Sequence, residues 1–188
     1  MTSAAGTQQR VVPRPILALA CFGALLVLAG VLWSVIDREP SPPTWALQGG
    51  AAVPRIDLPD LRDPTRRFNV PGTESLPIVM NVFSSTCAPC VEELPIFERL
   101  ARELSGEVRV VGIDHLDRRA AGLALLNRTG VTFPVGFDET GRLSTDYRLA
   151  GLPATFFIHA DGTLADSVLG PIGTDELHRK AKGLRRAY

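Results

Sequence analysis

The 188-residue sequence predicts an α/β domain, with a mixed β-sheet that has helices on both faces, preceded by one membrane-spanning helix. Three observations predict this arrangement. An uncharged apolar run near the N-terminus is long enough to cross a bilayer. Beyond it, short apolar runs rich in β-forming residues alternate with amphipathic helical patterns, which is typical of strand–helix–strand units. Near the C-terminus two further runs flank a tight turn, which predicts an antiparallel hairpin.

The N-terminal part of the chain carries the signal of a membrane anchor. Residues 16–36 form 21 consecutive positions without a charged side chain, and as a helix they would span about 30 Å, roughly one hydrocarbon core. Two arginines precede this run, whereas the charges directly after it sum to a negative value. The positive-inside rule therefore places residues 1–15 in the cytoplasm and the chain beyond residue 36 on the other side of the cell membrane.

A cleaved signal peptide is the alternative interpretation of this segment. Its apolar region usually runs only 7–15 residues before a small-residue cleavage site, so the longer run favours a retained anchor. In either case the downstream domain lies outside the cytoplasm, where disulfides persist. Residues 37–50 contain three prolines and a Gly-Gly pair and are expected to form a linker, and residues 51–188 form the folded domain.

The first elements of the domain follow from hydrophobic periodicity. A buried strand is expected at residues 76–83, an apolar run that begins after Gly72 and ends before two serines. Residues 90–104 place apolar side chains every three or four positions, which predicts an amphipathic helix that ends before Gly106. A second buried strand is expected at residues 108–113.

The later elements repeat the same signals. A second helix is expected over residues 118–128, with Gly130 as its C-terminal stop. Apolar runs on either side of the turn at residues 160–163 predict strands at 154–159 and 164–169, and one last helical pattern predicts a final helix at 175–186. Before the first buried strand, residues 56–61 and 67–70 are expected to form a small additional hairpin.

Composition excludes two classes of protein. The 20 Lys and Arg residues are balanced by 20 Asp and Glu residues, so there is no basic surface charge with which to bind nucleic acid. A hydrophobic share of 45% excludes a disordered chain.

Cys87 and Cys90 are the only cysteines outside residues 16–36, and they lie where an apolar strand passes into a helix. A helix N-terminus offers unpaired N–H groups and partial positive charge, which would stabilise a Cys87 thiolate. Cys90, one turn further on, falls within disulfide reach. Cys87 can therefore attack a substrate disulfide, and Cys90 can resolve the mixed disulfide that forms. Pro89 fits the first helical turn, where its missing N–H costs nothing.

Two other roles are conceivable for the cysteine pair, a structural disulfide and a zinc site. A purely structural disulfide would close too short a loop to stabilise the chain much. A zinc site would need four suitably spaced ligands, and His115, His159 and His178 are scattered, so no metal ion or other cofactor is predicted. His115 and His159 are expected to be surface residues at strand ends.

The segment from Ile78 through Cys87-Ala88-Pro89-Cys90 to Pro95 resembles the active-site segment of membrane-anchored thioredoxin-like proteins of the TlpA, ResA and CcmG type. The run Phe133-Pro134-Val135-Gly136-Phe137-Asp138, Tyr147, and the run Gly151-Leu152-Pro153-Ala154-Thr155-Phe156-Phe157-Ile158 before the turn at 160–163 extend the likeness. The resemblance covers about residues 50–185.

The resemblance implies a thioredoxin-like fold in which Pro153 follows a cis peptide bond and lies against the cysteine pair. It implies that Leu152 presents a backbone edge for a substrate peptide, and that Ala88 and Pro89 contact the substrate as well. Glu93 matches an acidic residue that helps to move the proton of the resolving thiol. Without the family, Glu93 is equally a first-turn acid favoured by the helix dipole. Asn81 stands where thioredoxin has a buried Asp, so proton transfer must involve another group.

The resemblance also implies a thiol–disulfide oxidoreductase that acts outside the cytoplasm. Its expected substrates are disulfides of exported proteins, for example apocytochrome c, and its expected electron donor is a transmembrane thiol carrier. One departure concerns the residue before the first cysteine, which is usually Trp in this family and is Thr86 here. That change bears on both substrate choice and redox potential.

Two functions of other classes share this fold. A peroxiredoxin-like peroxidase would need Ser or Thr three residues before its cysteine, as at Ser84, and a proline further upstream, where Met80 stands. A copper metallochaperone of the Sco type would need a C-x-x-x-C motif and a distant His, whereas this chain has C-x-x-C.

Overall fold

The computed structural model describes residues 49–72 and 76–186, with side chains described as far as residue 185. The predicted anchor at residues 16–36 and nearly all of the predicted linker lie outside the described residues. Within the described part of the chain, no helix combines the length and the apolar character needed to cross a membrane.

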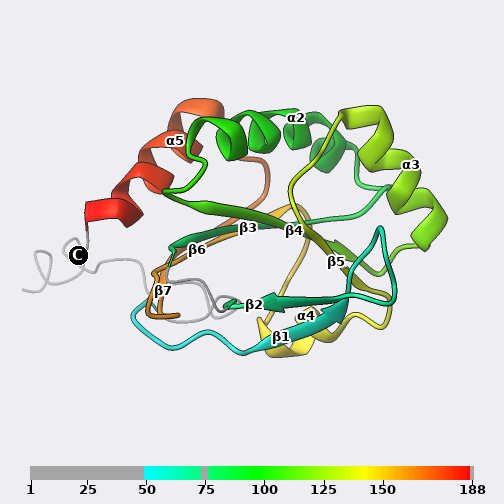
Figure 1. The fold of residues 1–188 in the computed structure, drawn as a ribbon, viewed down its shortest axis with the longest axis horizontal. Helices are drawn as coiled ribbons and strands as arrows, with labels where there is room; N and C mark the ends of the chain where they lie inside the picture. The colour runs from blue at the N-terminus through cyan, green and yellow to red at the C-terminus, as the bar shows by residue number, and fades with distance from the viewer. Residues whose placement is uncertain (1–48, 73–75, 187–188) are drawn as a thin grey trace, which may run out of the picture. The chain divides into compact units, whose positions relative to one another are not determined.

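The centre of the domain is a five-stranded mixed sheet with strand order β5-β4-β3-β6-β7 (Figure 1). Three strands run parallel to one another: β3 (Ile78–Phe83), β4 (Arg109–His115) and β5 (Val135–Asp138). On the other side of β3, strand β6 (Ala154–Ile158) pairs antiparallel with it, and β7 (Leu164–Leu169) pairs antiparallel with β6. The antiparallel strands form the hairpin that the sequence predicts.

Helices cover both faces of this sheet, as predicted. The crossovers from β3 to β4 and from β4 to β5 pass through α2 (Ala88–Glu103) and α3 (Arg119–Thr129), and right-handed crossovers place both helices on one face. The C-terminal α5 (Thr174–Gly183), extended by a single 3₁₀ turn, packs on the same face (Figure 1). The opposite face is covered by the short α4 (Arg142–Asp146) and by a separate hairpin. That hairpin consists of β1 (Ile56–Pro59) and β2 (Arg67–Val70).

The alternation of β3 side chains divides the core into two layers. Val79 and Phe83 belong to the layer under α2, α3 and α5, whereas Ile78, Met80 and Val82 belong to the layer toward the β1–β2 hairpin. All six β3 residues are buried, because both faces of the strand are covered. The strand that leads into the cysteine pair is therefore held rigidly from both sides.

Three elements differ from the sequence-based expectation: β5, α4 and the start of α2. Neither β5 nor α4 was predicted, because β5 has only four residues and α4 only five, too few to show a periodic pattern. The first turn of α4 is stabilised by a residue of β5, because the Asp138 carboxylate accepts hydrogen bonds from the backbone N–H groups of Arg142 and Leu143. The active-site helix also starts earlier than predicted, at Ala88 instead of residue 90.

Candidate active site

Cys87 and Cys90 form a disulfide at the N-terminus of α2. Cys87 is the N-cap residue, with extended backbone angles (φ −91°, ψ 101°), and its N–H donates to the Ser84 carbonyl at 3.1 Å. The S–S distance is 2.06 Å and the two Cα atoms lie 5.3 Å apart, inside the usual bridging range. The pair thus sits where the chain leaves β3 and the free N–H groups of the helix begin.

The two sulfur-bearing residues differ in their exposure. Cys87 is half-buried and packs against the edge of the core, whereas Cys90 has no exposed surface and lies within the core layer under α2. Ala88 and Pro89, between them, are exposed, and Pro89 occupies the first turn of the helix as expected. Only Cys87 can therefore be reached by a protein-sized substrate.

Leu152 and Pro153 lie at the start of β6. The peptide bond between them is cis, as the resemblance implied. Pro153 is buried and its carbonyl accepts a hydrogen bond from Gly170 at 2.8 Å. Leu152 is half-buried and packs against the same core layer as Cys87. Within the described residues, the backbone N–H and C=O of Leu152 have no hydrogen-bond partner.

Glu93 faces the sheet from the second turn of α2, so it is not a first-turn acid. Its side chain is buried, with 3% exposure. Oε1 accepts a hydrogen bond of 2.7 Å from the Asn81 side-chain amide, and Oε2 accepts one of 3.3 Å from the Ile172 N–H. Burial raises the pKa of Glu93 to about 7, and the two hydrogen bonds only partly oppose this shift. The carboxyl group can therefore both take up and release a proton near neutral pH.

Asn81 and Thr155 add two more polar side chains to this buried region. They are direct partners in the register of β3 and β6, and both are fully buried. Asn81 Oδ1 and Thr155 Oγ1 have no hydrogen-bond partner among the described residues. The sequence shows only a Thr in an apolar run, so this polar pairing becomes visible only when the register is known.

A pair of carboxyl groups was also missed by sequence reasoning. Asp114 is fully buried at the end of β4, and burial, followed by the neighbouring Asp117, raises its pKa to about 8. Asp117 accepts a 2.6 Å hydrogen bond from the Ser85 N–H, two residues before Cys87. Asp117 thereby holds the turn that precedes Cys87. The recurrence of Asp after a buried strand is the only signal that could have suggested these two acids.

His115, expected at the surface, is buried with 4% exposure and bonded through both ring nitrogens. The expectation was wrong because β5 pairs with β4 as far as His115 and covers the strand end. Among the described residues, no group of three or more His, Cys, Asp or Glu side chains is arranged to hold a metal ion.

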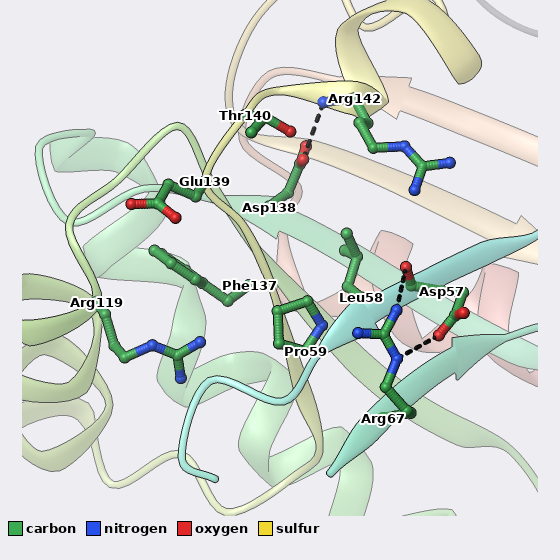
Figure 2. Close-up of a pocket in the computed structure, with 10 residues that line it drawn as sticks. All are labelled: Asp57, Leu58, Pro59, Arg67, Arg119, Phe137, Asp138, Glu139, Thr140 and Arg142. Carbon is green, nitrogen blue, oxygen red and sulfur yellow. Dashed lines mark hydrogen bonds and ion pairs between the residues drawn. The ribbon is translucent and has the colours of Figure 1, made fainter. Parts of the chain in front are cut away.

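A pocket of about 380 Å³ lies between the β1–β2 hairpin and β5, among residues that include three arginines (Figure 2). Arg67 is paired with Asp57, and Arg142 lies 3.6 Å from Asp146. Arg119 donates to two backbone carbonyls, and its guanidinium lies 4.6 Å from the centre of the Phe137 ring. Neither cysteine lines this pocket, and two of its three arginines are paired with carboxylates.

Comparison with known proteins agrees with this geometry. The family model described as the AhpC/TSA family matches residues 50–167. The thiol:disulfide interchange protein DsbE of Allochromatium vinosum is 32% identical over 156 residues, which cover 82% of this chain and 84% of that protein. The DsbE of Escherichia coli K12 is 26% identical over 180 residues, covering 93% and 96% of the two chains.

A solved structure shows the same fold. The crystal structure of a DsbE-like protein from Chlorobium tepidum superposes with a TM-score of 0.68 at 19% identity, over 74% of this chain and 99% of that one. The mixed sheet and its helices are thus the thioredoxin-like α/β fold that the motifs implied. The family-model match, these relatives and the disulfide at the start of α2 show that the chain belongs to the AhpC/TSA family of thioredoxin-fold proteins, and its activity is that of a thiol–disulfide oxidoreductase.

Proposed function

We propose that the chain reduces disulfides of exported proteins, with Cys87 as the nucleophile and Cys90 as the resolving thiol. The observation that carries this proposal is the asymmetry of the pair. Cys87 is accessible at the positive end of a helix, whereas Cys90 is enclosed by the core. A purely structural disulfide needs no such difference between its two ends.

The exchange proceeds in two steps. The Cys87 thiolate attacks one sulfur of the substrate disulfide, forms a mixed disulfide, and releases the other substrate sulfur as a thiolate. Cys90 then gives up its proton and attacks the Cys87 sulfur. This step frees the second substrate thiolate and leaves the Cys87–Cys90 disulfide, so two thiols of the chain are oxidised and one substrate disulfide is reduced.

Glu93 is proposed to receive the proton of Cys90 in the second step. It lies three residues after Cys90, on the same side of α2, where such side chains are roughly 5–6 Å apart at Cβ. A carboxyl group with a pKa of about 7 matches the demand of proton transfer near neutral pH. Asn81, whose amide has no acidic proton, positions this carboxyl group.

The substrate is proposed to dock beside the disulfide on Leu152 and Pro153. The unpaired backbone groups of Leu152 suit an extended peptide that adds itself as a strand. Ala88 and Pro89, exposed between the cysteines, complete the contact surface.

The cellular setting is part of the proposal. Residues 16–36 are proposed to anchor the chain in the cell membrane, with residues 1–15 in the cytoplasm and the catalytic domain outside. Exported proteins such as apocytochrome c are the proposed substrates, and a transmembrane thiol carrier is the proposed electron donor. A membrane-impermeant maleimide should label reduced Cys87 in intact cells expressing a Cys21→Ser chain. Labelling only after lysis would contradict the topology.

Turnover of a model substrate tests the activity. The full-length chain should accelerate the reduction of insulin by dithiothreitol, Cys87→Ser should abolish the acceleration, and the matched control Cys21→Ser should retain it. Equilibration with redox buffers then tests the direction. A reductant should have a potential nearer that of thioredoxin, about −270 mV, than that of protein disulfide isomerase, about −180 mV. A value above the latter would identify an oxidant.

A further inference from the structure

A second pocket, of about 340 Å³, is lined by Thr86, the residue before Cys87, and by Leu152, although neither cysteine lines it. The pocket is therefore bordered by the residue that precedes the nucleophile and by the proposed docking edge. Its volume is at the lower end of the range for ligand pockets, roughly 300–1,000 Å³, which suits a single side chain better than a larger ligand.

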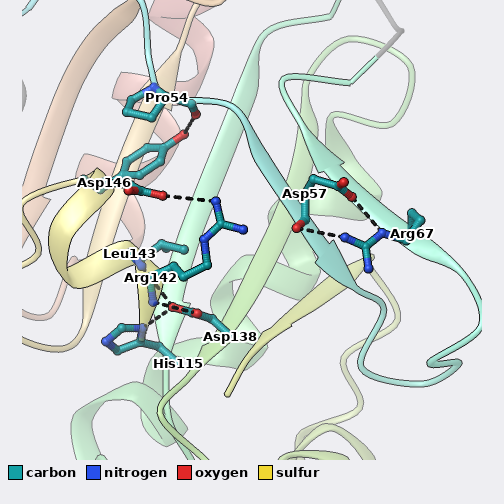
Figure 3. A network of polar contacts seen from close by, with 9 residues as sticks. Pro54, Asp57, Arg67, His115, Asp138, Arg142, Leu143 and Asp146 are labelled. Carbon is teal, nitrogen blue, oxygen red and sulfur yellow. Dashed lines mark hydrogen bonds and ion pairs between the residues drawn. The ribbon is translucent and has the colours of Figure 1, made fainter. Parts of the chain in front are cut away.

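The polar side of this pocket is formed by His115, which is buried, and by Ser144, which is exposed, and the His115 ring is held by Asp138. Asp138 accepts hydrogen bonds from the Arg142 and Leu143 N–H groups and from His115, with 2.7 Å between Asp138 Oδ2 and His115 Nδ1 (Figure 3). These hydrogen bonds lower the pKa of Asp138 against the effect of its burial, so the group is a carboxylate. A carboxylate can only accept, so Nδ1 of His115 must carry the proton, and in the neutral imidazole Nε2 is an acceptor.

Ser144 lines the pocket and contacts the His115 ring. Its Oγ lies 3.1 Å from His115 Nε2, and a neutral imidazole makes the hydroxyl the donor in this contact. The single proton of Ser144 is then engaged, and its oxygen presents only lone pairs to the pocket. A ligand that pairs with Ser144 must therefore supply a hydrogen-bond donor.

The rim of the pocket is apolar. Leu149 and Leu152 are half-buried there, and Leu116 is 60% exposed, the more exposed of two large apolar side chains that face solvent in the described residues. Leu116 has a positive φ of 50°, which an L-residue adopts only at a cost and which is frequent at binding sites. An exposed leucine in a strained conformation at the edge of this pocket is explained if a substrate covers it.

We propose that this pocket binds a substrate side chain adjacent to the reactive cysteine, and that it selects an aromatic side chain that carries a hydrogen-bond donor, such as tyrosine. The apolar rim packs on the ring, and Ser144, oriented by His115 and Asp138, accepts the hydrogen bond of the hydroxyl. The inference rests on the proposed function, because it assigns a specificity site to the same dithiol.

Paired peptides that differ by one hydroxyl group test this selection. Short glycine-based peptides place Tyr or Phe immediately before or after a single Cys that is in disulfide linkage with glutathione. Reduced full-length chain reacts with each peptide at about pH 8. The chain is oxidised to its disulfide while peptide thiol and glutathione are released. We expect the rate constant for Tyr to exceed that for Phe by about tenfold in at least one position, the contribution of one hydrogen bond.

Matched variants on α4 separate this selection from a general effect. Ser144→Ala should reduce the Tyr-to-Phe ratio to about one, whereas Thr145→Ala, at an exposed neighbour that does not line the pocket, should leave it unchanged. A ratio near one in the unmodified chain, or a ratio that persists in Ser144→Ala, overturns the proposal. Oxidised glutathione serves as a substrate without an aromatic group: if it is not reduced either, the proposed function itself fails.

Discussion

The side-chain amide of Asn81 donates a 2.7 Å hydrogen bond to Glu93 and so connects the central strand β3 to the active-site helix α2. By resemblance, Asn81 stands where thioredoxin has a buried Asp. Glu93, its hydrogen-bond partner, supplies a carboxyl group from the helix. Both side chains are buried, and the pKa of Glu93 is raised to about 7 by that burial. In this chain the ionisable member of the pair therefore lies on the helix, and its partner on the strand is a neutral amide.

Replacing the buried carboxyl group should change how stability depends on pH. The folded-state pKa of Glu93 lies above its ordinary value of 4.5, so folding takes up a proton and stability is lost as the pH rises from about 4.5 to about 7. The glutamine of Glu93→Gln has no proton to take up, so this variant does not lose that stability. Its unfolding free energy should therefore rise relative to the parent chain by about 3 kcal/mol between pH 4 and pH 8. Urea unfolding of the oxidised chains measures this difference.

The control for this experiment is Glu92→Gln, one residue earlier on the exposed side of the same helix. It should show no such pH-dependent gain. If the two variants behave alike, Glu93 is ionised in the folded state throughout this range, and the proton-transfer role proposed for it loses its basis.

The close packing of α3 against Asp114 predicts an asymmetric response to two glycine substitutions. A Cβ atom at Gly122 would lie 1.9 Å from Asp114 Oδ2, whereas nothing lies within 4 Å of a Cβ at Gly183 in α5. Gly122→Ala should therefore destabilise the fold by about 1–3 kcal/mol, and Gly183→Ala should be neutral or stabilising by up to about 1 kcal/mol. Thermal unfolding compares the two. Equal effects would mean that the buried carboxyl group does not occupy this space.

The difference in exposure between the two cysteines predicts which variant traps substrates. Cys90→Ser leaves Cys87 free to attack but removes the group that resolves the mixed disulfide, so complexes sensitive to dithiothreitol should accumulate in cells. Cys87→Ser leaves Cys90 as the only cysteine of the folded domain, where it is enclosed, and should trap at least tenfold less; both variants carry Cys21→Ser. Non-reducing electrophoresis and mass spectrometry of the complexes would also identify the substrates. Comparable trapping by both variants would refute the assigned order of attack.

The cysteine pair and its place on the fold could be predicted because their signals are local. The apolar run of β3, the helical periodicity after it and the Cys87–Cys90 spacing all lie within one short stretch of chain. Glu93 was recognised by resemblance, but its partners could not be, because Asn81 is 12 residues away and Ile172 is 79 away. Only the folded chain brings these groups together.

Strand β5 escaped prediction for a related reason. It has four residues, and Gly136 in its middle is a poor strand former. The structure shows why glycine is needed there: a Cβ atom would lie 2.6 Å from the Phe68 ring of β2. Tertiary packing therefore requires glycine here despite its low strand propensity. The same strand pairs with β4 as far as His115, which lines the second pocket.

The pH profile of Cys87 alkylation tests the central claim most directly. In reduced full-length Cys90→Ala chain, the iodoacetamide rate at Cys87 is followed by peptide mass spectrometry, which separates it from Cys21. The helix N-terminus should stabilise the thiolate, so the rate should reach half its plateau at least one pH unit below the value for a free cysteine, about 8.5. A half-plateau at or above that value would contradict Cys87 as the activated nucleophile.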